Sequence, residues 1–211
     1  WCCFSTVKIM LFLTLTFGMI YGSFLNVIIY RLPENISIIT PRSFCPKCKV
    51  KIPFYNNIPL LSFLIQKGKC FSCKKTISTQ YPIIELLIGI TCMVSYHFSQ
   101  FPESIFFSLI TGVLISIIII DYRYLIIPFE LLLASFALCI AYVLSSSYLT
   151  YHLYGMLMGV GYLSFIFIIT WIATKKQPLG FGDLQLILVL GFWLGPLKIL
   201  ITIFLGSILG I

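Results

Sequence analysis

The chain contains only two aspartates, Asp121 and Asp183, and both lie beside long apolar segments. Ionisable side chains at membrane depth are costly, so an acidic residue next to a membrane segment predicts a functional role. Two carboxylates held close together at a partly desolvated site do not both ionise easily. One of them keeps its proton, and the pair can act as general base and general acid toward a water molecule. The two aspartates therefore indicate the chemistry of an aspartyl protease at a membrane surface.

Two glycines next to Asp183 strengthen this interpretation. Gly180 and Gly182 are separated by one residue, and glycine permits unusual dihedral angles and the close approach of another backbone, such as a substrate strand. A structural alternative stays open for each aspartate. Asp183 could cap the following helix and favour its dipole, and Asp121 could pair with Arg123 in an interfacial turn.

Competing hydrolase motifs are missing from the sequence. It contains neither H-E-x-x-H, the pattern of many zinc proteases, nor the G-x-S-x-G turn of serine hydrolases. The two histidines, His97 and His152, have no acidic cluster near them. We expect both to be interfacial loop residues on the face opposite the aspartates.

Four cysteines form a second candidate site. They occur as "CPKC" at 45–48 and "CFSC" at 70–73, two C-x-x-C pairs with 21 residues between them. This spacing predicts a four-cysteine zinc site, which has no open coordination position and is therefore structural. Disulfides and a redox-active pair are the alternatives, and a reducing compartment disfavours disulfides. The predicted metal ligands are Cys45, Cys48, Cys70 and Cys73.

The composition places both candidate sites in a membrane protein. Hydrophobic residues make up 60% of the 211 residues, charged residues make up 9%, and the mean hydropathy is +1.06. Soluble domains usually have about 25% charged residues. The predicted fold is an all-α polytopic membrane protein with about seven or more transmembrane segments. We expect helices at about 8–30, 82–99, 103–120, 124–146, 152–174, 184–195 and 197–211, the last two divided at Gly195 and Pro196.

The basic residues predict the orientation of the chain. Residues 31–80 hold nine of the 14 lysines and arginines and one acidic residue, Glu34. Cytoplasmic loops carry excess positive charge, so this segment is expected in the cytoplasm, with attraction to anionic lipid headgroups as a second role. Nucleic-acid binding is not expected, because no recognisable module for it is present. Counting crossings from this loop places both aspartates at the cytoplasmic face. The predicted organisation is a first transmembrane helix at 1–30, a basic cytoplasmic zinc-binding loop domain at 31–80 and a membrane peptidase core at 81–211.

The sequence resembles the type IV prepilin peptidases, a family of membrane aspartyl proteases that are also N-methyltransferases. The matching stretches, in chain order, are "GSFLNVIIYRLP" (22–33), the two cysteine pairs, "NIPLLSFL" (57–64), "YPIIELLIG" (81–89), "DYRYLIIP" (121–128) and "GFGD" (180–183). The family pattern usually continues G-x-G-D-x-K, whereas position 185 is Gln185. The acidic residue expected directly after Ile-Pro is replaced by Phe129, and Glu130 follows one position later.

The resemblance implies that Asp121 and Asp183 cut the short basic leader from prepilin or pseudopilin precursors at the cytoplasmic face of the bacterial inner membrane. Pilus, type II secretion and competence systems use such enzymes. In the family, the new N-terminus is methylated with S-adenosylmethionine. We expect the cofactor-binding residues near the polar segment, and each has a structural alternative in packing, hydrogen bonding, topology or ion pairing. The candidates are Gly22, Asn26, Arg31, Glu34 and Glu85.

Two other classes of function compete with this assignment. An ion- or proton-coupled transporter could use Asp121 and Asp183 as binding groups, but its acidic residues or broken helices are expected near the bilayer midplane. A membrane scaffold could use the cysteine segment to recruit a partner. That class leaves the twin glycines before Asp183 without a role.

Overall fold

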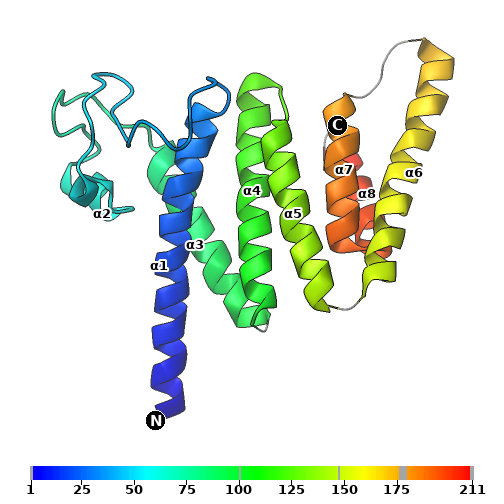
Figure 1. Cartoon of the computed structure of the whole chain (residues 1–211), viewed down its shortest axis with the longest axis horizontal. Coiled ribbons are helices and arrows are strands. Elements are labelled where there is room, and N and C mark those ends of the chain that lie inside the picture. The colour runs from blue at the N-terminus through cyan, green and yellow to red at the C-terminus, as the bar shows by residue number, and fades with distance from the viewer. Residues whose placement is uncertain (1, 100, 147, 176–179, 210–211) are drawn as a thin grey trace. The chain divides into compact units, whose positions relative to one another are not determined.

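The computed structural model describes residues 2–99, 101–146, 148–175 and 180–209. Within these ranges the regular elements are helices, and the only β-pairing consists of isolated bridges. The all-α fold predicted from the sequence is therefore confirmed. The chain forms two compact units, Trp1–Tyr124 and Leu125–Ile211 (Figure 1). The functional limits predicted at residues 30 and 80 stay a prediction.

The first unit consists of three long helices and the polar loop between the first two of them. Helix α1 packs along α3, and α4 packs against both. The interior is apolar, with Leu25, Ile88 and Ile117 each at most 2% exposed. Because α3 and α4 run in opposite directions, the start of α3 and the end of α4 lie at the same end of this unit (Figure 1). The elements are α1 (Cys2–Arg31), η1 (Phe54–Asn57), α2 (Leu61–Ile65), α3 (Gln80–Phe98) and α4 (Glu103–Tyr124).

Helix α4 continues further than the sequence predicted. We expected a turn at residues 121–124, but the helix ends at Tyr124, and α5 begins at Phe129 rather than at residue 124. The break follows from two local features. Leu125 adopts a left-handed conformation with φ of 54°, and the residue before Pro128 is disfavoured in a helix. Asp121 therefore lies inside the last turn of α4.

The second unit contains four helices. Helix α6 packs along α7 and α8, and α5 packs against α7. The predicted division at Gly195 and Pro196 is confirmed as the boundary between α7 and α8. The turn predicted at 175–183 falls partly on residues 176–179, which lie outside the described residues, and α7 begins at Phe181 instead of residue 184. The helices are α5 (Phe129–Ser146), α6 (Leu149–Thr174), α7 (Phe181–Leu194) and α8 (Pro196–Leu209).

His152 is not the interfacial loop residue that we expected. It lies in α6, is 6% exposed, and its Nδ1 is 2.8 Å from the carbonyl oxygen of Phe192 in α7. That carbonyl has no helical donor four residues later, because Pro196 lacks an N–H group. The carbonyl oxygen can only accept, so Nδ1 donates. His152 therefore ties α6 to α7 by satisfying a backbone group that the proline leaves open.

Four helices of the described chain are long and apolar enough to cross a membrane. They are Val7–Arg31, Gln80–Phe98, Glu103–Tyr124 and Leu149–Thr174, and three shorter apolar helices are present in addition. Helices α7 and α8 each have 14 residues, or about 21 Å at 1.5 Å per residue, against a hydrocarbon core of about 30 Å. The structure is thus that of a multi-helix membrane protein with four candidate spans, and the predicted count of seven or more is not confirmed.

Candidate functional site

The two C-x-x-C pairs form a single four-cysteine cluster in the loop of the first unit. The Sγ atoms of Cys45, Cys48, Cys70 and Cys73 all lie within 4.8 Å of one another, and all four residues are free thiols rather than disulfides. Tetrahedral zinc with Zn–S bonds of about 2.3 Å requires sulfur atoms about 3.8 Å apart. The cluster therefore fits a tetrahedral metal ion, and the grouping of the four cysteines predicted from their spacing is confirmed.

The two cysteine pairs have the same backbone geometry. In the first, the N–H of Lys49 donates to the Cys45 carbonyl at 2.8 Å, and in the second the N–H of Lys74 donates to the Cys70 carbonyl at 3.0 Å. Both lysines are left-handed, with φ of 60° and 57°. The N–H of Cys73 lowers the pKa of the Cys70 thiol to about 7, although burial acts in the opposite direction. The second turn thus favours the thiolate form of Cys70, which binds metal. At Cys48 the N–H of Val50 acts in the same direction, but burial and the neighbouring thiols raise the pKa to about 11.

Arg31 fixes this loop to the end of α1. It is 3% exposed, and its guanidinium donates to the carbonyl oxygens of Ser37, Ile38 and Arg42 at 2.9, 3.2 and 3.3 Å. It also lies 5.3 Å from the ring centre of Phe44. A buried guanidinium with several carbonyl partners holds the chain in place. Arg31 is therefore an organiser of the loop.

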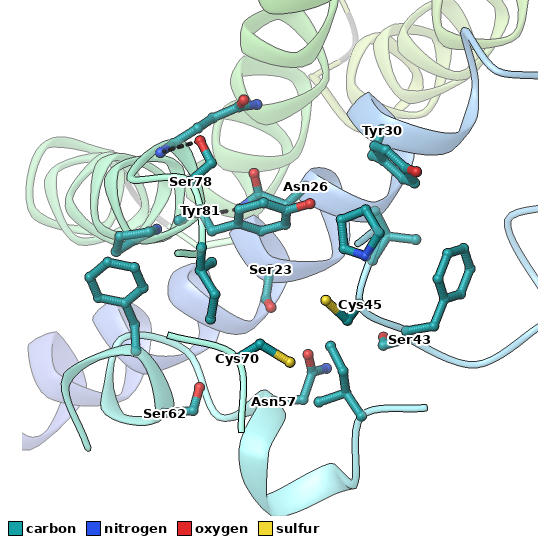
Figure 2. A pocket seen from close by; sticks show the side chains of 18 of the residues that line it. Ser23, Asn26, Tyr30, Ser43, Cys45, Asn57, Ser62, Cys70, Ser78 and Tyr81 are labelled. Carbon is teal, nitrogen blue, oxygen red and sulfur yellow. Dashed lines mark hydrogen bonds between the residues drawn. The ribbon is translucent and has the colours of Figure 1, made fainter. Parts of the chain in front are cut away.

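A cavity of about 440 Å³ lies between the cysteine loop, α1, α3 and the end of α4 (Figure 2). From α1 it is lined by Ser23, Asn26 and Tyr30, whose spacing places them on one face of the helix. Cys45 and Cys70 form part of the opposite wall, so the metal cluster and the cavity share residues. Pockets of this size accommodate small molecules and cofactors. The cavity is the principal candidate for a ligand site in the first unit.

Asn26 and Glu85 are the two predicted cofactor residues that the cavity brings together as acceptors. Asn26 is 3% exposed, and its Nδ2 donates to the Tyr81 carbonyl at 3.1 Å, while its Oδ1 has no hydrogen-bond partner in the described chain. Glu85 is 7% exposed, and its Oε2 accepts the N–H of Leu60 at 2.8 Å. Leu60 has a positive φ of 58°, so this hydrogen bond holds a strained turn of the loop.

Of the other three cofactor candidates, Arg31 lines the cavity, whereas Gly22 and Glu34 do not. Gly22 faces α3, where a Cβ atom would lie 2.9 Å from the Cα of Glu85. It therefore allows the two helices to approach and positions Glu85, which agrees with the packing role considered for it. Glu34 is exposed and lies outside the cavity lining. Conversely, Ser23 and Tyr81 were missed, although the polar residues at 23, 26 and 30 of an apolar helix were a visible signal.

Asp121 is exposed in the last turn of α4, at the same end of the first unit as the cavity. Arg123 and Tyr124, in the same turn, line the cavity. The ion pair between Asp121 and Arg123 that we considered is not formed, although both residues are described. Side chains two residues apart on a helix do not face each other, which explains its absence.

Asp183 lies in the first turn of α7 and is half-buried. Its Oδ2 accepts the N–H of Gly180 at 3.1 Å, so the capping role considered for it is present. Gly180 has φ and ψ of −72° and 149°, which any residue can adopt, so the expectation of an unusual backbone there was wrong. At Gly182, a Cβ atom would lie 3.2 Å from Ile127. Gly182 thus allows the segment before α5 to pack on the first turn of α7.

The two aspartates belong to different units, Asp121 to the first and Asp183 to the second. Each lies within one turn of a helix end, as the sequence predicted. The pairing of their carboxylates stays a prediction. Gln185, where the resemblance predicted a lysine, lies in α7 two residues after Asp183 and is half-buried.

These features define a multi-pass helical membrane protein with a four-cysteine loop and carboxylates at helix ends. Comparison with known families specifies the class further. The model for the bacterial peptidase A24 N-terminal domain matches residues 16–98, and the model for the type IV leader peptidase family matches residues 108–211. The two matches cover both units of the structure.

Curated relatives agree with the family models. The chain is 33% identical to the prepilin leader peptidase/N-methyltransferase of Stutzerimonas stutzeri, with 93% of this chain and 78% of the relative covered. It is 31% identical to the enzyme of the same name from Neisseria gonorrhoeae, with 92% of this chain and 77% of the relative covered. It is 33% identical to the one from Klebsiella pneumoniae, with 90% of this chain and 87% of the relative covered. No solved structure matches the chain. The chain belongs to the prepilin leader peptidase/N-methyltransferase family.

Proposed function

We propose that this protein cleaves the leader peptide of type IV prepilin-like precursors and N-methylates the new N-terminus. The observation that carries the proposal is the match to relatives named for both activities, which extends over more than 90% of this chain. The substrates would be prepilins or pseudopilins of pilus, type II secretion or competence systems. Placement of Asp121 and Asp183 near helix ends, rather than in mid-helix, favours a peptidase over an ion- or proton-coupled transporter.

The peptidase reaction is assigned to Asp121 and Asp183. The ionised carboxylate takes a proton from water, whose oxygen attacks the scissile carbonyl, while the protonated carboxyl group donates a hydrogen bond to the carbonyl oxygen. Collapse of the tetrahedral intermediate breaks the C–N bond, and the leaving nitrogen takes up a proton. The chain connectivity and one packing contact support this pairing. Residues 125–128 follow Asp121 closely in the chain, and Ile127 of that segment packs on Gly182, next to Asp183.

The cysteine cluster is proposed to hold one structural zinc ion. The four thiols leave no open position for a catalytic water, and the loop around them has little apolar interior of its own. Zinc would therefore stabilise the fold of the loop rather than take part in cleavage. The lysines on this loop, most of them exposed, would also attract anionic lipid headgroups.

We place the protein in the bacterial inner membrane, with the cysteine loop and both aspartates at the cytoplasmic face. Seven or more crossings would require the shorter helices α5, α7 and α8 to span the membrane as well. The nine basic residues in 31–80 support this orientation. Both units would then have the ends that carry the aspartates on the cytoplasmic side.

The orientation predicts the labelling of single introduced cysteines. Phe101→Cys, in the exposed turn between α3 and α4, should react with a membrane-impermeant thiol reagent added to intact cells from outside. Tyr55→Cys, in the cysteine loop, should react only after the membrane is opened. Mass spectrometry of the labelled peptides separates these sites from the native cysteines. The reverse pattern would invert the topology.

The proposed function is tested by incubating the purified protein with a peptide that carries a basic leader, a glycine and an apolar helix. Mass spectrometry should find the leader released after the glycine. With S-adenosylmethionine present, the new N-terminus should also gain one methyl group. An intact peptide would contradict the peptidase assignment, and cleavage without an added methyl group would contradict the second activity alone.

A further inference from the structure

The cavity of the first unit contains a polar atom that the protein itself does not satisfy. Asn26 Oδ1 is buried without a donor, although Nδ2 of the same amide donates to the Tyr81 carbonyl at 3.1 Å. Buried acceptors in folded proteins are nearly always hydrogen-bonded, and an exception calls for an unseen partner such as a ligand. Figure 2 shows Asn26 and Ser23 from α1 beside Tyr81 in the cavity.

The walls of the cavity carry complementary charges at different depths. Glu85 is the one carboxylate among its lining residues, and it is 7% exposed. Lys75 and Arg123 also line the cavity but are exposed, whereas Arg31 is engaged with loop carbonyls. A ligand that fits this pattern has N–H and O–H donors for the interior and a carboxylate for the exposed cations.

This charge pattern argues against the basic leader peptide as the occupant. The exposed cations Lys75 and Arg123 would repel lysines and arginines that approach the cavity. A small molecule with hydroxyl and amine donors and one carboxylate would pair its donors with the buried acceptors and its carboxylate with the exposed cations. A volume of about 440 Å³ is within the range of sites for ligands of this size.

We propose that the cavity enclosed by α1, α3, the end of α4 and the cysteine loop is the S-adenosylmethionine site, with Asn26 Oδ1 and the Glu85 carboxylate as its buried acceptors. The inference rests on the proposed N-methyltransferase function. When bound, S-adenosylmethionine supplies a methyl group whose C–S bonding pair passes to sulfur as the amine nitrogen of the substrate forms the new N–C bond. Ser23 and Tyr30 complete the polar face of α1.

The position of the cavity also suits the order of the two reactions. Arg123 and Tyr124 line it from the last turn of α4, the same turn that carries Asp121. An N-terminus produced by cleavage at Asp121 would therefore arise near the cavity. The amine must lose its proton before it can accept a methyl group, and solvent at the exposed side of the cavity can take up that proton.

The test is a binding measurement that does not depend on turnover. Purified full-length protein in detergent is titrated calorimetrically with S-adenosylhomocysteine, the demethylated form of the donor. Asn26→Ala and Glu85→Gln should each weaken binding by about tenfold or more. The first removes the acceptor oxygen, and the second replaces one of two acceptor oxygens with an NH2 donor and removes the negative charge. Glu103→Gln, the same chemical change at an exposed carboxylate in the first turn of α4 and outside the cavity lining, should leave binding unchanged.

Ultraviolet cross-linking of radiolabelled S-adenosylmethionine to the unmodified protein gives a second measurement that does not depend on the folding of any variant. The adduct should map to peptides covering residues 23–31 or 78–85. If the wild type binds the nucleoside but the adduct maps elsewhere, the cavity assignment is overturned. It is also overturned if both variants bind S-adenosylhomocysteine as tightly as the wild type. Neither result contradicts the methyltransferase function. A wild type that neither binds the nucleoside nor methylates the peptide overturns both.

Discussion

Asp183→Asn and Asp121→Asn should each slow leader cleavage by at least about a hundredfold, because an amide cannot exchange a proton with the attacking water or the leaving group. The substitution at position 183 is informative because Asp183 also caps the first turn of α7, and asparagine can keep that cap. The amide oxygen of asparagine can still accept the N–H of Gly180, which Asp183 accepts at 3.1 Å in the structure. The first turn of α7 is thus expected to stay intact. Cleavage of a prepilin peptide, followed by mass spectrometry, measures the effect.

The comparison with Asp183→Ala distinguishes chemistry from capping. Alanine removes both the proton-transfer group and the cap, at a stability cost of about 1 kcal/mol. If Asp183 served only as a cap, the asparagine variant would cleave normally and the alanine variant would be impaired. If Asp183 is catalytic, both are inactive. Glu130→Gln, an exposed carboxylate in the first turn of α5, is the matched control and should cleave at the wild-type rate.

Removing the metal should unfold the cysteine loop. The purified protein is expected to contain about one zinc ion per chain, and Cys45→Ser or Cys70→Ser should lose it, because each removes one of the four clustered thiols. Structural zinc in small domains contributes about 10–16 kcal/mol of binding free energy. Without the metal, residues 43–76 should therefore become sensitive to proteolysis, while the helices outside the loop stay protected.

Metal analysis and limited proteolysis measure these effects. Cys139→Ser, a buried cysteine outside the cluster, should keep its zinc and its proteolysis pattern. Protein that contains no metal and whose loop cysteines are joined as disulfides would contradict the assignment. Because Cys45 and Cys70 also line the cavity, loss of zinc should weaken S-adenosylhomocysteine binding in parallel.

Patterns with strong local signals could be predicted from the sequence. The four cysteines are a clear case, because each C-x-x-C pair folds locally into a turn that is closed by a hydrogen bond to the carbonyl of its first cysteine. Long apolar segments likewise predicted most of the helices, because their length and composition are local properties of the sequence. The end of α4 was predicted wrongly, since residues 121–124 are polar and resemble a turn, whereas the break is caused by Leu125 and Pro128.

Features that depend on contacts between distant segments could not be predicted. Gly182 has its role because Ile127 packs on it, and Gly22 because α3 lies against it. His152 was misassigned because its partner, the Phe192 carbonyl, is 40 residues away. The cavity itself requires α1, α3 and the loop to come together. The sequence suggested Asn26 and Glu85 only through resemblance, and the unsatisfied Oδ1 atom became visible in the fold.

The proposed peptidase mechanism requires Asp121 and Asp183 to form one catalytic site. This can be measured by replacing both with cysteine and treating membranes with a mild oxidant, because a disulfide requires Cα atoms about 4.4–6.8 Å apart. Peptide mapping by mass spectrometry should then find residues 121 and 183 joined, directly or through a short thiol-reactive linker. Single replacements should yield no such product. A double variant that inserts and retains its zinc, yet never links these two positions, would contradict the paired-carboxylate mechanism.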